Sequence, residues 1–146
     1  MKISVMGTGY VGLVSGACLA ERGHQVTCID IRPEVVQEIN AGRPPIHEIG
    51  LDKLLRSARD KGMLSATTDA KTAILDSDVT LICVGTPTVD GRMDMSQIVA
   101  AAKEIGSALA SKRGYHVVAV KSTVLPGTTE GPVKAAIESH SGRKVG

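Results

Sequence analysis

The amino-acid sequence predicts an α/β fold built on a doubly wound parallel sheet with helices on both faces. Three observations indicate it. Apolar, strand-like segments alternate with helix-like segments along all 146 residues, without a repeat or a low-complexity stretch. The core must be aliphatic, because the chain has two Tyr and no Phe or Trp, and this suits a sheet covered on both faces. The chain also opens on an apolar strand that runs into a glycine-rich turn and a helix.

The opening segment carries the dinucleotide-binding pattern Gly-x-Gly-x-x-Gly, followed by helical spacing of apolar residues up to Arg22. Gly7 lets the chain turn sharply out of the strand, Gly9 lets the backbone approach a pyrophosphate, and Gly12 lets the helix pack closely. The amides of Thr8 to Gly12 would face the phosphates, where the helix dipole favours negative charge. Because the triplet alone is weak evidence, the flanking strand and helix are what favour a Rossmann-like fold.

The second predicted strand, Val26 to Asp30, ends in an acid. Its distance from the glycine turn is close to the roughly 20 residues at which a carboxylate accepts hydrogen bonds from an adenosine ribose. Such a carboxylate repels the 2′-phosphate of NADP, whereas Arg32 argues the other way, and on balance we expect NAD as the cofactor. The alternative to a cofactor site is a purely structural one, in which the segment is a tight strand-to-helix turn and Asp30 is solvated.

The remaining elements follow from periodicity and from residues that start or stop helices. Pro33 suits the first turn of a helix, and Asp69 is expected to cap a short one. Asp94 is expected to cap a longer helix, with Gln97 completing a capping box, after a polar connection from Thr88 to Arg92. The expected strands are 63–67, 79–84 and 116–120, and the expected helices are 33–40, 51–61, 70–75, 95–112 and 130–139.

In such a sheet, ligands bind beyond the carboxyl ends of the strands. The segments that leave strands at this edge all carry glycine, hydroxyl or charge: 7–12, 30–32, 85–87 and 122–127. Connections at the opposite edge, such as 21–24 and 76–78, are expected to be ordinary solvated turns.

The cysteines and histidines do not predict a metal site. The three cysteines lack metal-ligand spacing and are expected to be small core residues: Cys18, Cys28 and Cys83. The histidines are scattered and are expected at surface or turn positions: His24, His47, His116 and His140.

Composition argues against two classes of partner. The net charge of +2 is too small for a nucleic-acid partner, and the basic residues are scattered singly. No apolar run approaches the roughly 20 residues of a membrane span. Met1 and Lys2 pass directly into a strand rather than a signal peptide. We therefore expect a cytoplasmic protein with no membrane association.

Three motifs carry a family resemblance: Gly-Thr-Gly-Tyr-Val-Gly-Leu at 7–13, Val-Gly-Thr-Pro at 84–87 and Lys-Ser-Thr-Val-Leu-Pro-Gly-Thr at 121–128. With these, essentially the whole chain resembles the UDP-glucose/GDP-mannose dehydrogenase family, and the third motif is far more specific than the glycine triplet. The resemblance implies an NAD-dependent, four-electron oxidation of a nucleotide sugar at C6, from alcohol through aldehyde to carboxylate. It implies two NAD and a cysteine that holds the aldehyde.

The resemblance also implies residue roles. It places Tyr10 and Val11 on the cofactor phosphates, Asp30 on the adenosine ribose, and Thr86 and Thr123 near the rest of the NAD. Hydroxyls after strands also cap helices or tie turns, so the two threonines have a purely structural alternative.

Two departures from the family's pattern stand out. Val35 occupies a position where the family usually has a basic residue, and Arg32 is the candidate to replace it as a cofactor contact. The family's Glu-Pro-Gly-Leu appears as Glu-Ile-Gly-Leu at 48–51, so this turn is assigned no role.

None of the cysteines matches the family's nucleophile. We expect residues 1–146 to be the amino-terminal NAD-binding domain of a longer enzyme, inactive alone, with the central helix and the substrate domain absent. The full-length protein is expected to be a homo-oligomer acting on a nucleotide sugar. The alternatives are a stand-alone NAD-binding regulatory module, or the amino-terminal domain of a hydroxyacid or 6-phosphogluconate type dehydrogenase.

Overall fold

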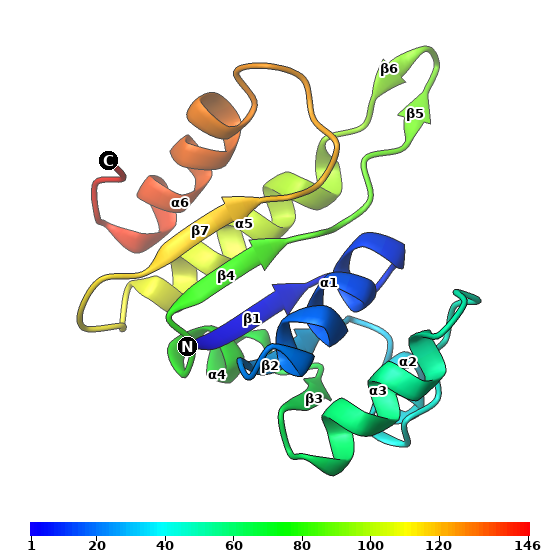
Figure 1. Cartoon of the computed structure of the whole chain (residues 1–146). Helices are drawn as coiled ribbons and strands as arrows, with labels where there is room; N and C mark the ends of the chain where they lie inside the picture. The colour runs from blue at the N-terminus through cyan, green and yellow to red at the C-terminus, as the bar shows by residue number, and fades with distance from the viewer.

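Five parallel strands form one sheet in the order β3-β2-β1-β4-β7 (Figure 1). The computed structural model describes residues 1–146, with strands β1 Lys2–Met6, β2 Gln25–Ile29, β3 Leu64–Thr67, β4 Val79–Ile82 and β7 Val117–Val120. The chain builds outward from β1 in one direction and then, from β4, in the other. The predicted doubly wound sheet is therefore confirmed, and the strand order reverses between β1 and β4, where such sheets bind ligands.

Helices cover both faces of the sheet, and each face has its own apolar core. One core is formed with α1 Tyr10–Glu21, α2 Pro33–Asn40 and α3 Leu51–Asp60. The other is formed with α4 Ala70–Leu75, α5 Ser96–Leu109, the π-helical segment η1 Thr129–Val133 and α6 Lys134–Ser141. Side chains alternate between the cores along each strand, so Val5 lies in the first and Met6 in the second.

The connection after β4 differs from the prediction. Instead of a plain polar connection, it forms a small antiparallel hairpin of β5 Thr88–Val89 and β6 Arg92–Met93. Asp90 and Gly91 have φ values of 49° and 72°, as a two-residue type I′ turn requires. The Asp-Gly pair was the available signal for this hairpin. Figure 1 shows the hairpin projecting beyond the edge at which the strands end.

One predicted helix cap is confirmed and the other is wrong. The Asp69 carboxylate accepts a hydrogen bond from the Thr72 amide at 3.0 Å and caps α4. The long helix α5, however, has Met95 rather than Asp94 at its N-cap. Asp94 instead accepts from the Ser96 amide at 2.8 Å in a local turn. There is thus no capping box with Gln97, whose side chain lies beside Gly85.

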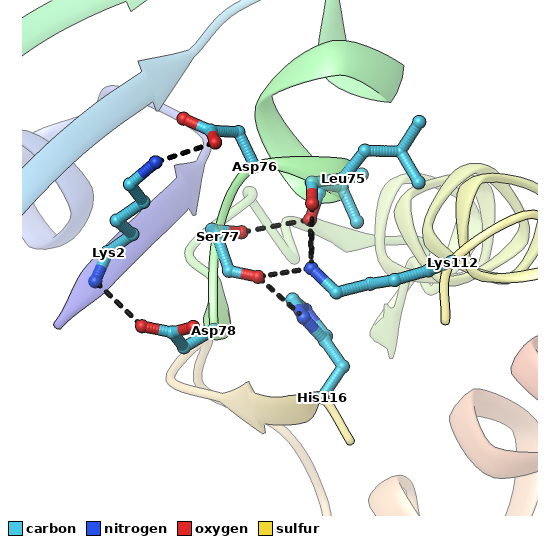
Figure 2. Close-up of polar contacts among 8 residues, drawn as sticks. Lys2, Leu75, Asp76, Ser77, Asp78, Lys112 and His116 are labelled. Atoms are coloured by element: carbon cyan, nitrogen blue, oxygen red, sulfur yellow. Dashed lines mark hydrogen bonds and ion pairs between the residues drawn. The ribbon is translucent and has the colours of Figure 1, made fainter. Parts of the chain in front are cut away.

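The turn at 76–78 is not an ordinary solvated turn, as Figure 2 shows. Ser77 is buried. Lys112 donates from Nζ to the carbonyl oxygens of Ile74 at 3.0 Å and Leu75 at 2.9 Å, and also to that of Ser77. The Ile74 and Leu75 carbonyls belong to the last turn of α4, and that of Ile74 also accepts from the Ser77 amide and hydroxyl. The lysine cation therefore adds a donor at the negative end of the helix.

His116 belongs to the same network and is half-buried rather than a surface residue. Its Nδ1 lies 3.1 Å from the Ser77 carbonyl oxygen and its Nε2 lies 2.8 Å from Thr80 Oγ1. Because a carbonyl only accepts, Nδ1 carries the proton and Nε2 of the neutral ring accepts from Thr80. Burial is the main reason that the pKa of His116 is lowered, and the Lys112 cation adds to it.

Two smaller points complete the fold. Cys28 and Cys83 are buried as expected, but Cys18 is exposed on α1, so its prediction as a core residue is wrong. None of the helices is both long and apolar enough to cross a bilayer.

Candidate functional site

The glycine turn between β1 and α1 is closed on its inner side and open on its outer side. Gly7 has a φ of +96°, and a Cβ there would lie 2.8 Å from the Cys83 carbonyl oxygen. A Cβ on Gly12 would lie 1.9 Å from the Gly7 carbonyl oxygen, so only glycine allows the helix to start so close to the strand. A Cβ on Gly9 would meet nothing within 4 Å. The open side is thus the side from which a ligand can reach the backbone.

A row of backbone amides is free at this turn. Gly7 donates to the Ile29 carbonyl at 2.9 Å, and Leu13 makes the first bond of α1, to the Gly9 carbonyl. The amides between them, from Thr8 to Gly12, donate to no acceptor in the chain. Free amides at a helix N-terminus, combined with the positive end of its dipole, form a site for phosphate. The flanking side chains of Tyr10 and Val11 are exposed.

Asp30 lies beside this turn, and its side chain is only 6% exposed. The buried Thr8 hydroxyl donates to Asp30 Oδ2 and so ties the acid to the glycine turn. Arg32 donates to Asp30 from its backbone amide and its Nε at 3.0 Å, and from Nη2 at 3.1 Å. Burial by itself would raise the pKa of Asp30, but the hydrogen bonds from Arg32 and Thr8 outweigh it and lower the pKa to about 2. The carboxylate is therefore charged at neutral pH.

A cavity of about 450 Å³ opens next to Asp30, within the size range of small-molecule sites. Its walls are the ends of β1, β2 and β4, the residues that follow them, and one face of α5. Of the predicted site residues, Gly7, Asp30 and Arg32 line it.

Thr86 and Thr123 do not line this cavity. The Thr86 hydroxyl donates to the Thr123 carbonyl oxygen at 2.7 Å, which joins the segment after β4 to the segment after β7. The Thr86 hydroxyl thus has the structural role that the sequence left as its alternative, because it links two turns.

Sequence reasoning missed several residues of the site. The Thr8 side chain was overlooked because only its amide was considered. Gln97 was assigned to a helix cap, yet it lines the cavity together with Glu104. Gln97 and Glu104 are seven residues apart, and this spacing could have indicated that their side chains share one face of a helix.

The residues present fit a dinucleotide. The free amides match a diphosphate, the adjacent carboxylate matches ribose hydroxyls, and the cavity beyond it has room for a base. Val35, at the position where a basic residue was missing, is buried. Arg32 is 56% exposed and paired with Asp30, so it is the nearest cation to this carboxylate.

Comparison with known proteins agrees with this geometry. Residues 1–146 match the family described as "UDP-glucose/GDP-mannose dehydrogenase family, NAD binding domain". Over 147 aligned residues the chain is 48% identical to GDP-mannose 6-dehydrogenase of Pseudomonas aeruginosa, covering 100% of this chain and 34% of that protein. It is 45% identical over 148 residues to a UDP-glucose 6-dehydrogenase of Haloferax volcanii, again covering 100% and 34%.

Solved structures show the same likeness. A ternary complex of GDP-mannose dehydrogenase from Pseudomonas aeruginosa superposes with a TM-score of 0.97 at 48% identity, covering 99% of this chain and 33% of that one. The chain thus spans about a third of the length of the curated relatives that it matches.

Proposed function

Because the chain belongs to the UDP-glucose/GDP-mannose dehydrogenase family, as its NAD binding domain, we propose that it holds NAD for a nucleotide-sugar 6-dehydrogenase. The proposed substrate is UDP-glucose or GDP-mannose, oxidised to the uronate with two NAD. The observation that carries the proposal is the row of free amides from Thr8 to Gly12 beside the buried Asp30 carboxylate.

In this proposal the glycine turn binds the diphosphate. The amides from Thr8 to Gly12 donate to its oxygens, and Gly9 leaves room for their approach. Tyr10 and Val11, exposed on the first turn of α1, flank it. These donors lie in the turn before α1 and in its first turn, which Gly12 packs closely against the Gly7 carbonyl, so they need no reorganisation to bind.

Asp30 is proposed to accept hydrogen bonds from the adenosine ribose, and Arg32 to orient the carboxylate that does so. Thr86 and Thr123 are proposed to lie near the rest of the cofactor, where the hydrogen bond from the Thr86 hydroxyl to the Thr123 carbonyl sets the distance between two loops. When bound, the nicotinamide ring supplies the acceptor for a hydride.

Residues 1–146 are proposed to form the Rossmann domain of the enzyme. Since the chain spans about a third of its relatives, the nucleophile, the sugar-nucleotide site and a homo-oligomeric assembly are proposed to belong to the protein beyond this domain. A cytoplasmic location, without nucleic acid or membrane as partner, is proposed with it.

Titration of NAD onto the uniformly ¹⁵N-labelled chain tests the proposal. We expect saturable binding, with the largest amide chemical-shift changes at residues 8–12 because these amides would gain an acceptor. The amides of 76–78, at the opposite edge of the sheet, serve as an internal control and should not move. Absence of binding, or shift changes that spare the glycine turn, would contradict the proposal.

A further inference from the structure

One face of α5 forms the far wall of the cavity beside Asp30. The residues on it recur at helical spacing: Gln97, Ala100, Ala101 and Glu104. The two alanines leave an apolar gap between the two polar side chains. Ile31 also lines the cavity and is 89% exposed although it is a large apolar residue. The cavity therefore has apolar walls suited to a flat ring.

Glu104 is a free acceptor in this cavity. Its side chain is exposed, and none of the ion pairs of the chain includes it. Asp30, the other carboxylate of the cavity, is already held by Thr8 and Arg32. A ligand in the cavity therefore meets two carboxylates: Asp30, which is held in place, and Glu104, which has no partner.

The order of these groups matches the order of parts in an adenosine. A ribose held by Asp30 next to the glycine turn directs its base away from the diphosphate and into the cavity. We propose that Glu104 selects the base: its carboxylate accepts a hydrogen bond from the 6-amino group of adenine. The ring then lies between Ile31 and the alanines of α5. This inference rests on the proposed binding of NAD at the same site.

The chemistry of the two polar side chains explains why Glu104, rather than Gln97, discriminates. A carboxylate is only an acceptor, so it favours an amino group and repels a carbonyl oxygen at the same position. Hypoxanthine, which carries a carbonyl oxygen at C6, would face this repulsion. The Gln97 amide can turn to present either a donor or an acceptor and so accommodates both bases.

The test compares NAD with nicotinamide hypoxanthine dinucleotide, which differs only in the base. Isothermal titration is carried out on the wild-type chain, on Glu104→Gln, and on the control Glu130→Gln, an exposed carboxylate of η1 outside the cavity. We expect the wild type to bind NAD about tenfold more tightly than the hypoxanthine dinucleotide, because a hydrogen bond to a charged group contributes at least this much free energy. In Glu104→Gln, whose amide can donate to the C6 carbonyl, the preference should fall to near unity. Glu130→Gln should keep it.

The outcomes separate the inference from the proposed function. If the wild type binds NAD but discriminates no better than Glu104→Gln, Glu104 does not read the base and only the inference fails. Equal affinity of the wild type for both dinucleotides has the same meaning. If the wild type binds neither, the proposed function fails and the inference fails with it.

Discussion

Asp30 is a buried acid that keeps its charge. Burial alone would raise its pKa, but hydrogen bonds from Arg32 and Thr8 lower the pKa to about 2. The same donors fix the direction of the carboxylate, with Thr8 on Oδ2 and the Arg32 amide on Oδ1. The negative charge that this carboxylate keeps repels a 2′-phosphate, and this is the property that discriminates a free ribose from a 2′-phosphorylated one.

We predict that Asp30→Ala weakens NAD binding by about tenfold or more, the value of hydrogen bonds to a charged group. It should also narrow the preference for NAD over NADP, because the repulsive carboxylate is lost and the Arg32 guanidinium is released. Titrations with both cofactors measure the ratio. Asp52→Ala, a half-exposed acid on α3 outside the cavity, is the control. An unaltered NAD to NADP ratio in Asp30→Ala would refute the prediction.

His116 makes stability depend on pH. Its pKa is lowered by burial, and the nearby Lys112 adds to this, so the folded chain binds the proton at lower pH than the unfolded chain does. The unfolded chain takes up the proton near pH 6.5. Stability is therefore fully present above that pH and is lost as pH falls toward the folded pKa.

The matched variant is His116→Gln, which cannot titrate. We predict that thermal unfolding of the wild type shifts downward between pH 7.5 and 5.5 by more than that of His116→Gln. Equal shifts of the melting temperature in the two proteins would show that another group is responsible.

Among the elements, α4 shows how a short helix is held. Six residues are too few for a stable isolated helix. Asp69 satisfies its N-terminus, and Lys112, just beyond α5, satisfies the carbonyls at its C-terminus. Contacts between α4 and α5 then bury one face of the short helix.

We predict that Lys112→Met destabilises the fold by roughly 1–3 kcal/mol, because the Leu75 carbonyl loses its donor and the Ile74 and Ser77 carbonyls each lose one of theirs. The methionine keeps most of the apolar stem, so the loss reports on the ammonium group. Chemical denaturation measures it. Lys103→Met, an exposed lysine on α5, should change stability little, and a similar effect of the two variants would argue against the cap.

The glycine turn allows a paired test of packing and binding. Gly12→Ala places a Cβ 1.9 Å from a carbonyl oxygen, and we predict a loss of about 1–3 kcal/mol of stability from overpacking. Gly9→Ala places its Cβ in open space, so it should cost less stability, but the methyl group occupies the approach of the diphosphate. Gly9→Ala should therefore fold and lose NAD affinity. A Gly9→Ala variant with wild-type affinity would show that the diphosphate does not approach here.

At the scale of the whole molecule, the sheet gathers segments that are distant in the sequence. Parallel strands end at one edge, so the turns after β1, β2, β4 and β7 all lie on the same side of the molecule (Figure 1). The cavity lies beside the reversal of strand order, between β1 and β4. The two apolar cores hold these turns from both faces.

We predict that the 146-residue chain alone does not turn over NAD with UDP-glucose or GDP-mannose. Burial raises the pKa of Cys28 to about 12 and that of Cys83 to about 11, so neither supplies a thiolate nucleophile at neutral pH. Cys18 is exposed, but it lies near the end of α1 that is remote from the glycine turn. Absorbance of NADH measures turnover, with a full-length relative as the positive control. Sustained NADH formation by the chain would contradict the prediction.

The sequence by itself determined the alternation of strands and helices and the geometry of the glycine turn. These depend on local properties: apolar periodicity, the conformational freedom of Gly7, and the capping chemistry of Asp69. The Asp90-Gly91 turn was equally local and could have been recognised. Gln97 was misassigned because its position three residues after Asp94 fits a capping box, whereas its place in the cavity wall depends on how α5 packs against the sheet.

Only the tertiary structure decided which side chains contact one another or line the same cavity. The Thr8 bond to Asp30, the presence of Ile31 and Glu104 in one cavity, and the network around Ser77 join residues from elements that are far apart in the chain. The burial of Ser77 and the exposure of Cys18 were decided in the same way. Their physical reason is that burial and hydrogen-bond partners depend on the packing of neighbouring elements, which no local pattern encodes.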